Sequence, residues 1–373
     1  MGWSLKIGRI AGITVFMHMT FVLFIVWVGL SHWLRGHSAT AALTGIAFIL
    51  ALFGCVLLHE LGHSLTARKY GIQTRDITLL PIGGVARLER MPDDPRQELW
   101  VAIAGPAVNV VIAALLYAWL QIAGGWEPLA RLDVGSGSFV QRLMVVNVVL
   151  VLFNLLPAFP MDGGRVLRAL LALRMDYTRA TQIAANVGQA MALLFGFAGL
   201  LGQPMLLFIA FFVWIGAAGE ANMTQMKSAL GGIPIERAMQ TNFQTLAVRE
   251  PLSRAVELVL AGSQHDFPVL EEDGRVAGVL TRADLLAALA QRGQHTPIAE
   301  VMRRDICVAD AGEMLEPVFA RLRQDECPSI PVTRNGQLAG LLTTENVGEF
   351  LMIQAALRAE RNGSQPDRTA LAR

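Results

Sequence analysis

The sequence predicts a polytopic α-helical membrane domain of about six spans, followed by an α/β domain outside the membrane. Hydrophobic residues make up 53% of the 373 residues and charged residues only 16%, whereas soluble proteins average about 25% charged residues. Of the 61 charged residues, 26 lie in residues 1–222 and 35 in the remaining 151. The chain therefore divides into a membrane domain at 1–222, a linker at 223–232, an α/β region at 233–352 and a flexible tail at 353–373.

Several uncharged stretches are long enough to cross a hydrocarbon core, which needs about 20 helical residues. They cover residues 10–34, 38–58, 99–124, 143–161 and 180–219. The last stretch contains Gly202-Gln203-Pro204, which predicts a turn between two short helices. One long buried helix is the alternative, but Gly-x-Pro breaks helices. The count is six spans.

The distribution of basic residues predicts the orientation of these spans, because cytoplasmic loops are enriched in Lys and Arg. One side carries only Arg35, Arg131 and Arg142. The other side carries twelve: Lys6, Arg9, Arg68, Lys69, Arg75, Arg87, Arg90, Arg96, Arg165, Arg168, Arg174 and Arg179. We therefore expect a multi-pass protein of the cell membrane, embedded in the lipid bilayer, with the amino terminus and the α/β region in the cytoplasm. A net charge of +1 without a long basic run argues against nucleic acid as a partner.

The inner end of the second span carries His59-Glu60-Leu-Gly-His63. Residues four apart share one face of a helix, so both imidazoles can reach one metal ion while Glu60 holds a water molecule. The alternative is a chance pentapeptide, but three ionisable groups inside an apolar span are costly unless they have a function.

Zinc hydrolases need a third protein ligand and a position for water. Asp162 follows Pro157 and Pro160 at the inner end of the fourth span, at the membrane depth of the two histidines. We expect Asp162 to be the third ligand. An amino-terminal cap on the following helix is the alternative.

Three ordered motifs in residues 1–222 carry a family resemblance: His59-Glu-Leu-Gly-His63, Gly105-Pro-Ala-Val-Asn109 and Asn154…Pro160-Met-Asp162-Gly. Together they resemble the site-2 protease family of intramembrane zinc metalloproteases. The resemblance implies one Zn²⁺ per chain, bound in part by Asp162, and hydrolysis of a peptide bond within or near a transmembrane segment of a membrane-protein substrate. Glu60 would take a proton from the attacking water and later protonate the leaving amine.

A transporter or channel that binds a cation with the same residues is the alternative function. Transport needs alternating access and usually repeated halves, and the spans contain no such repeat.

Further residues are candidates for contact with the substrate or its oxyanion: Asn109, Asn154, Gly83 and Gly84. For the two asparagines, hydrogen bonding between helices is the alternative. Residues 72–88 contain alternating and β-branched residues around Pro81-Ile-Gly-Gly84, which predicts short strands at a turn. An open strand edge beside the metal would hold the substrate as an added strand. A plain cytoplasmic loop is the alternative.

The α/β region contains an internal repeat, at about 233–293 and 296–352. Met239 matches Met302 at a spacing of 63 residues, and one motif recurs at a spacing of 62: Gly278-Val-Leu-Thr281-Arg-Ala-Asp284 and Gly340-Leu-Leu-Thr343-Thr-Glu-Asn346.

This repeat resembles a tandem pair of cystathionine-β-synthase (CBS) domains. The resemblance implies binding of an adenine nucleotide (ATP, ADP or AMP), regulation of the protease, and a homodimer formed through these domains. Thr281 and Asp284 would bind nucleotide in the first repeat. Thr343 and Asn346 correspond in the second, where Asn346 departs from the usual Asp. The alternative is that both turns only cap helices.

Overall fold

The computed structural model describes residues 3–363, except 37, 93, 124–137, 263, 325, 326 and 328. It divides into two compact units, Met1–Thr224 and Gln225–Arg373. Four described helices of the chain are long and apolar enough to cross a membrane: α2 (Ala39–Lys69), α3 (Pro95–Ile122), α6 (Tyr177–Leu200) and α7 (Pro204–Leu230). Two shorter apolar helices accompany them, α1 (Met19–Gly36) and α4 (Phe139–Asn154). The expectation of a helical membrane domain is thereby confirmed.

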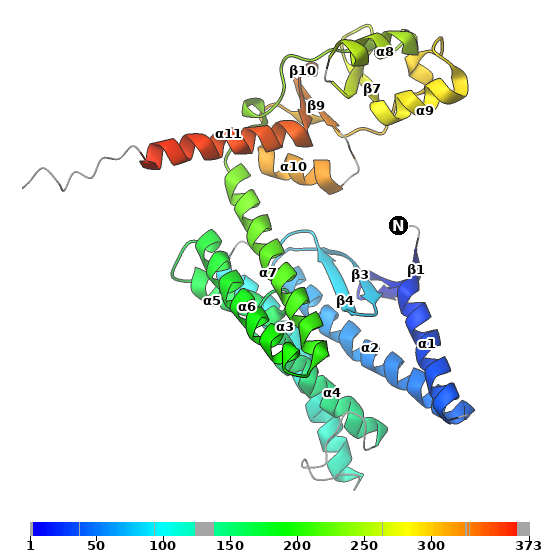
Figure 1. Ribbon diagram of the computed structural model, residues 1–373, viewed down its shortest axis with the longest axis vertical. Helices are drawn as coiled ribbons and strands as arrows, with labels where there is room; N and C mark the ends of the chain where they lie inside the picture. The colour runs from blue at the N-terminus through cyan, green and yellow to red at the C-terminus, as the bar shows by residue number, and fades with distance from the viewer. Residues whose placement is uncertain are drawn as a thin grey trace, which may run out of the picture. The chain divides into compact units, whose positions relative to one another are not determined.

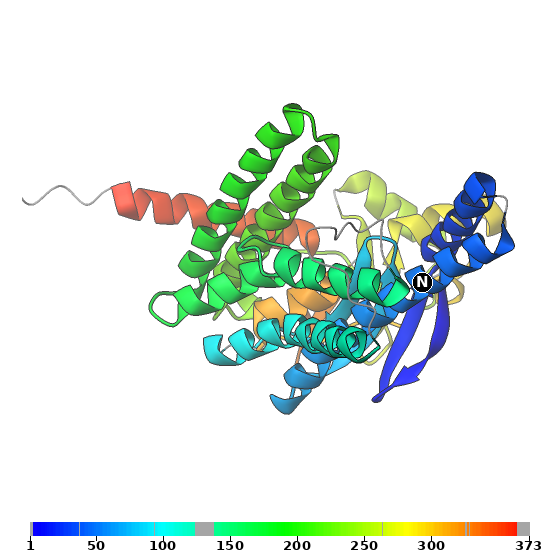
Figure 2. The same cartoon turned by 90° about the horizontal axis from the view of Figure 1, so that it is seen from below.

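Local signals set the ends of these helices. The Ser38 side chain accepts a hydrogen bond from the backbone of Ala41 and caps α2. Asp94 caps α3, whose first residue is a proline. The helices α6 and α7 run side by side (Figure 2) and are joined at Gly202, which has a φ of +126°. The two-helix hairpin expected at 180–219 is therefore confirmed.

Small residues let the backbones of α6 and α7 approach closely. A methyl group on Gly188 would lie 3.4 Å from Cβ of Ala217. Small side chains permit close packing of membrane helices. The rest of this contact is lined by buried alanines: Ala184, Ala185, Ala192, Ala217 and Ala221.

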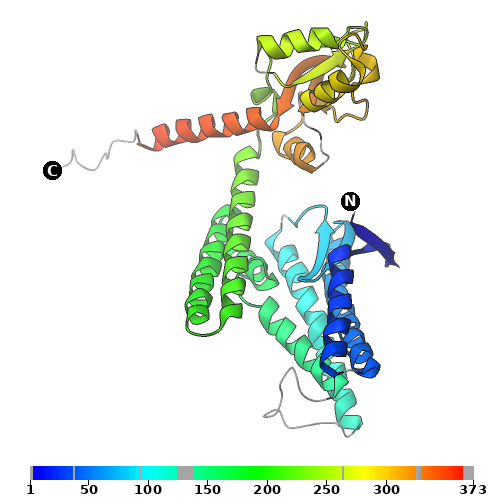
Figure 3. The same ribbon diagram turned by 45° about the vertical axis from the view of Figure 1, so that its right-hand side comes forward.

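The first unit also contains a four-stranded sheet at one end of the α1–α2 pair (Figures 1 and 3). Its order is β1-β2-β3-β4, with β2 and β3 parallel and the outer pairs antiparallel. The strands are β1 (Ser4–Ile10), β2 (Ile13–His18), β3 (Thr74–Leu80) and β4 (Gly83–Leu88). The strand hairpin expected in residues 72–88 is confirmed.

The span expected at 10–34 is wrong in its first third. The chain turns at Ala11 and Gly12, both with positive φ, and β2 then pairs with β3 before α1 begins at Met19. Length and lack of charge suited a helix, but the β-branched run from Ile13 to Val15 fits a strand, and Ile13 and Val15 are buried.

The span expected at 143–161 also ends early, because α4 stops at Asn154. A loop containing Pro157 and Pro160 leads into α5 (Asp162–Ala172). The start of α5 packs tightly on this loop: a methyl group on Gly163 would lie 2.2 Å from the carbonyl oxygen of Leu156. Asp162 is consequently the first residue of a closely held helix.

The second unit contains two similar halves. The first has β5 (Leu246–Ala247), α8 (Leu252–Ala261), β6 (Asp266–Leu270), β7 (Val276–Thr281) and α9 (Arg282–Arg292). The second has β8 (Ala309–Asp310), α10 (Leu315–Gln324), β9 (Ser329–Arg334), β10 (Gln337–Thr343) and α11 (Thr344–Gly363). Helical residues thus include 353–363 of the expected tail, and residues 364–373 lie outside the described chain.

The two halves exchange their leading segments. Ile235 packs in the core of the second half, whereas Ile298 packs in that of the first. Gln240 correspondingly pairs with Leu341, and Arg303 with Val279. The repeat in sequence is therefore offset from the units that pack together.

Candidate metal centre

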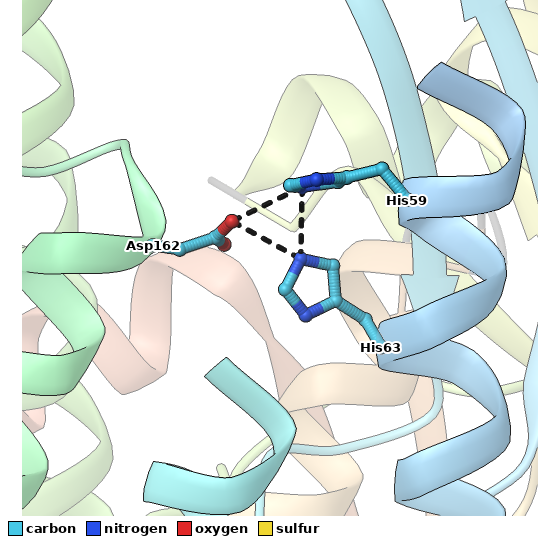
Figure 4. Close-up of side chains that lie close together, drawn as sticks. All are labelled: His59, His63 and Asp162. Carbon is cyan, nitrogen blue, oxygen red and sulfur yellow. Dashed lines mark hydrogen bonds and ion pairs between the residues drawn. The ribbon is translucent and has the colours of Figure 1, made fainter. Parts of the chain in front are cut away.

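His59, His63 and Asp162 converge although Asp162 is about a hundred residues further along the chain (Figure 4). The two histidines project from α2 and the carboxylate from the start of α5. The Nε2 atoms lie 3.1 Å apart, and each lies 3.1 Å from Oδ2 of Asp162. All three residues are buried.

Hydrogen bonds from behind fix the orientation of both rings. Nδ1 of His63 lies 2.7 Å from the carbonyl oxygen of Val101, to which it donates. Nδ1 of His59 lies 2.5 Å from Oδ1 of Asn109. The amide nitrogen of Asn109 donates in turn to Oδ1 of Asn147 at 2.8 Å, so Oδ1 of Asn109 is the acceptor for the N–H of His59. Such partners orient metal-binding histidines.

This arrangement fits a zinc ion. When Nδ1 carries the proton of a neutral imidazole, Nε2 carries a lone pair. Two such lone pairs and a carboxylate oxygen then point toward one another with no proton between them. A bound cation would stabilise this cluster of three electron-rich atoms. Atoms that bind zinc tetrahedrally at about 2.0–2.1 Å lie about 3.3–3.4 Å apart, close to the observed spacing.

Gly105 on α3 makes room for the two rings. A methyl group at this position would lie 2.2 Å from Nε2 of His63 and 2.7 Å from Nε2 of His59. The sequence analysis places Gly105 in a motif without assigning it a role. The space that Gly105 leaves beside the two rings depends on how α2 packs against α3.

Glu60 lies beside the two histidines and beneath β4. A methyl group on Gly84 would lie 2.7 Å from Cγ and 3.3 Å from Oε1 of Glu60, so the strand backbone passes directly over this side chain. Gly83 begins β4 with a φ of +141°, a conformation that favours glycine. Both expected glycines thus lie on the strand next to Glu60.

The two expected asparagines differ in their surroundings. Asn109 is fully buried and bonded to His59 and Asn147, so it orients the His59 ring and is not free to contact a substrate. Asn154 ends α4 and is half-buried. Within the described parts of the chain, its side chain forms no hydrogen bond.

The two nucleotide-binding candidates of the second unit have matching geometry. Thr281 donates to Asp284 at 2.6 Å, and Thr343 donates to Asn346 at 2.7 Å. Each threonine also accepts the backbone N–H of its partner, as a helix cap does. Arg303 binds both oxygens of Asp284, at 2.6 and 3.1 Å, and this hydrogen bonding lowers the pKa of the Asp284 carboxyl.

Comparison with known proteins places these features in a family. Residues 47–125 and 127–195 match Peptidase family M50, and residues 235–291 and 298–352 each match the CBS domain. A zinc metalloprotease from Methanocaldococcus jannaschii is 31% identical over 349 residues, which cover 93% of this chain and 96% of that protein. The chain belongs to the M50 peptidase family. It is a site-2 protease-like zinc metalloprotease with a carboxy-terminal CBS domain pair.

A second relative of this M50 protease covers a similar length. A putative zinc metalloprotease from a Synechocystis species is 28% identical over 373 residues, covering 95% of this chain and 97% of that protein. Among solved structures, a site-2 protease from Methanocaldococcus jannaschii is 37% identical and covers 59% of this chain and 95% of its own, with a TM-score of 0.43.

Proposed function

We propose that this zinc metalloprotease cleaves peptide bonds within or beside the transmembrane segments of other membrane proteins. His59, His63 and Asp162 would hold the zinc ion. The observation that carries this proposal is the meeting of their three electron-rich atoms at 3.1 Å, with both rings tied from behind. Bound zinc supplies a Lewis acid that polarises the scissile carbonyl and lowers the pKa of water.

In this proposal Glu60 moves the proton. Its carboxylate takes a proton from a water molecule as the water oxygen attacks the carbonyl carbon. Glu60 then donates that proton to the leaving nitrogen as the carbon–nitrogen bond breaks.

The sheet would present the substrate to Glu60. The strand β4 ends the sheet and runs over Glu60, so an extended substrate can add to its edge, with Gly83 and Gly84 allowing close approach. The half-buried amide of Asn154 would donate to the substrate carbonyl oxygen.

Co-expression of the wild type or Glu60→Gln with candidate single-span membrane proteins tests the reaction. We expect fragments cut at the membrane segment only with the wild type, and equal zinc contents in the two purified proteases. Cleavage of the same candidates by Glu60→Gln at the wild-type rate would refute the assignment.

We also propose that α1 and α4 cross the membrane with the four longer helices, giving six spans with the amino terminus and the CBS domains in the cytoplasm. The distribution of twelve against three basic residues supports this orientation. In a cysteine-free background, Arg174→Cys should react with an impermeant thiol reagent only in inside-out vesicles, whereas Gln203→Cys should react from outside intact cells. The reverse pattern would overturn the topology.

We further propose that the CBS domains bind an adenine nucleotide and thereby change proteolysis. Asp284 would accept a ribose hydroxyl, because a carboxylate has about four lone-pair sites and Thr281 and Arg303 together donate three hydrogen bonds to it. Asn346 offers one acceptor oxygen, so the site at Thr343 and Asn346 should be weaker.

Calorimetry with ATP, ADP and AMP on the full-length protein, with Asp284→Ala for comparison, tests nucleotide binding. Cleavage assays with and without nucleotide test the regulation. Absence of binding at millimolar concentration would leave the two turns as helix caps only.

A further inference from the structure

A completely buried arginine lies near the metal centre. Arg168, on α5, is 1% exposed, although its sequence position suggests a cytoplasmic loop. Its Nε and Nη2 atoms donate to Oε1 of Glu98 at 2.8 and 2.5 Å, and Nη1 donates to Oε1 of Glu220 at 2.5 Å. The guanidinium carbon also lies 5.0 Å from the ring centres of Phe159 and Tyr177. These contacts join α5 to α3, to α7, to the start of α6 and to the loop before Asp162.

The need for stability alone does not explain such a group. Removing a guanidinium and a carboxylate from water is costly, and well-packed apolar residues of similar size often stabilise a protein equally well. A charged pair adds geometric specificity that apolar packing lacks, because its directional hydrogen bonds fix both the axial position and the rotation of one helix relative to the other.

Glu98 belongs to the face of α3 that orients both histidines. Glu98, Val101, Gly105 and Asn109 are spaced three or four residues apart, so they share one side of the helix. Val101 accepts the N–H of His63, Asn109 binds the other histidine, and Gly105 leaves space beside both rings. The helix that holds the histidine rings is therefore the helix that holds Arg168.

Arg168 belongs to the helix that begins with the third ligand. Arg168 lies six positions after Asp162, about 9 Å along the helix axis. At the other end of this short segment, Gly163 and Gly164 pack against the backbone of the preceding loop. A shift of α5 relative to α3 would therefore move the Asp162 carboxylate relative to the two histidines.

We propose that Arg168 is a positioning residue that aligns the two halves of the metal centre. Through Glu98 it holds the Asp162 helix in register with the helix that orients His59 and His63. Glu220 on α7 binds the same guanidinium. Its side chain is 32% exposed, so this second ion pair is weaker than the one with Glu98. The inference rests on the proposed set of zinc ligands.

Cobalt substitution in the purified full-length protein tests this role, because the visible spectrum of bound Co²⁺ depends on ligand geometry. The variants are Arg168→Lys and Glu220→Gln, with Asn222→Ala as an exposed control on α7. We expect Arg168→Lys to change the spectrum and to lower Co²⁺ affinity, measured by chelator competition, about tenfold, the lower end for residues that support metal ligands. Glu220→Gln should change the Co²⁺ spectrum and affinity less than Arg168→Lys does, and Asn222→Ala should leave both unchanged.

A charge-free variant covers the case in which Arg168→Lys fails to fold. The double variant Arg168→Met with Glu98→Gln leaves no buried charge unpaired, so a purely structural role predicts wild-type affinity and spectrum. If every folded Arg168 variant shows wild-type Co²⁺ affinity and a wild-type spectrum, the positioning role is overturned.

Asp162→Ala separates this inference from the proposed ligand set. A wild-type cobalt spectrum in Asp162→Ala would reject Asp162 as a ligand and the positioning role with it. A changed spectrum there, with wild-type spectra in the Arg168 variants, would reject only the positioning role.

Discussion

Replacing Gly105 by alanine should weaken zinc binding by more than about a hundredfold, although it adds only one methyl group. Ordinary contact begins near 3.4 Å, whereas the methyl carbon would lie 2.2 Å from Nε2 of His63 and 2.7 Å from Nε2 of His59. The rings would have to withdraw by about 1.2 and 0.7 Å. Both displacements exceed the deviation of about 0.2 Å from ideal metal–ligand distances that a metal site tolerates. Hydrogen bonds to Val101 and Asn109 hold the rings from behind, so neither can retreat freely.

Elemental analysis and chelator competition on purified Gly105→Ala measure this effect. We expect zinc affinity to fall by more than about a hundredfold, beyond the range for loss of a supporting partner. Two glycine-to-alanine variants of α2 are controls. Gly54→Ala meets no atom within 4 Å and should behave as wild type.

The second control, Gly62→Ala, separates packing from metal binding. Its methyl would lie 2.8 Å from the carbonyl oxygen of Ala104 and not against the Nε2 atoms, so thermal stability should fall while zinc affinity falls much less than in Gly105→Ala. Wild-type zinc affinity in folded Gly105→Ala would refute the view that this gap is required by the ligands.

Three further outcomes follow from the contacts. Gly84→Ala should keep zinc but lose most cleavage, because its methyl would lie 2.7 Å from Cγ of Glu60; normal cleavage would argue against a close approach of β4 to Glu60 in the active enzyme. Asn109→Ala should weaken zinc binding about 10- to 100-fold by freeing one histidine ring, and unchanged affinity in chelator competition would contradict that role. Arg303 lowers the pKa of Asp284, so their pairing should stabilise the CBS domains at neutral pH and lose this effect as the pH falls below the ordinary carboxyl range. Thermal unfolding of Arg303→Gln should accordingly differ from wild type at pH 7 and converge with it as the pH falls through the lowered pKa of Asp284; a constant difference would contradict the linkage.

The sequence alone determined the features that depend on local periodicity and composition. The helical spacing of His59 and His63 places them on one face, wherever the helix packs. The apolar composition identifies the membrane domain, and the 62- to 63-residue repeat identifies the paired carboxy-terminal domains. Asp162 could be selected as a candidate ligand because orientation rules placed it at the depth of the histidines.

Only the tertiary structure decided which faces meet, because contacts between distant segments leave no periodic signal in one sequence. Residues 13–18 satisfy the composition of a span, yet pairing with β3 makes them a strand. Asn109 is a polar residue in an apolar span and is therefore a candidate for substrate contact, yet the packing of α3 on α2 places its side chain against His59. Arg168 reads as a cytoplasmic basic residue, and only the meeting of α3, α5 and α7 shows a buried charge whose partners lie 70 and 52 residues away.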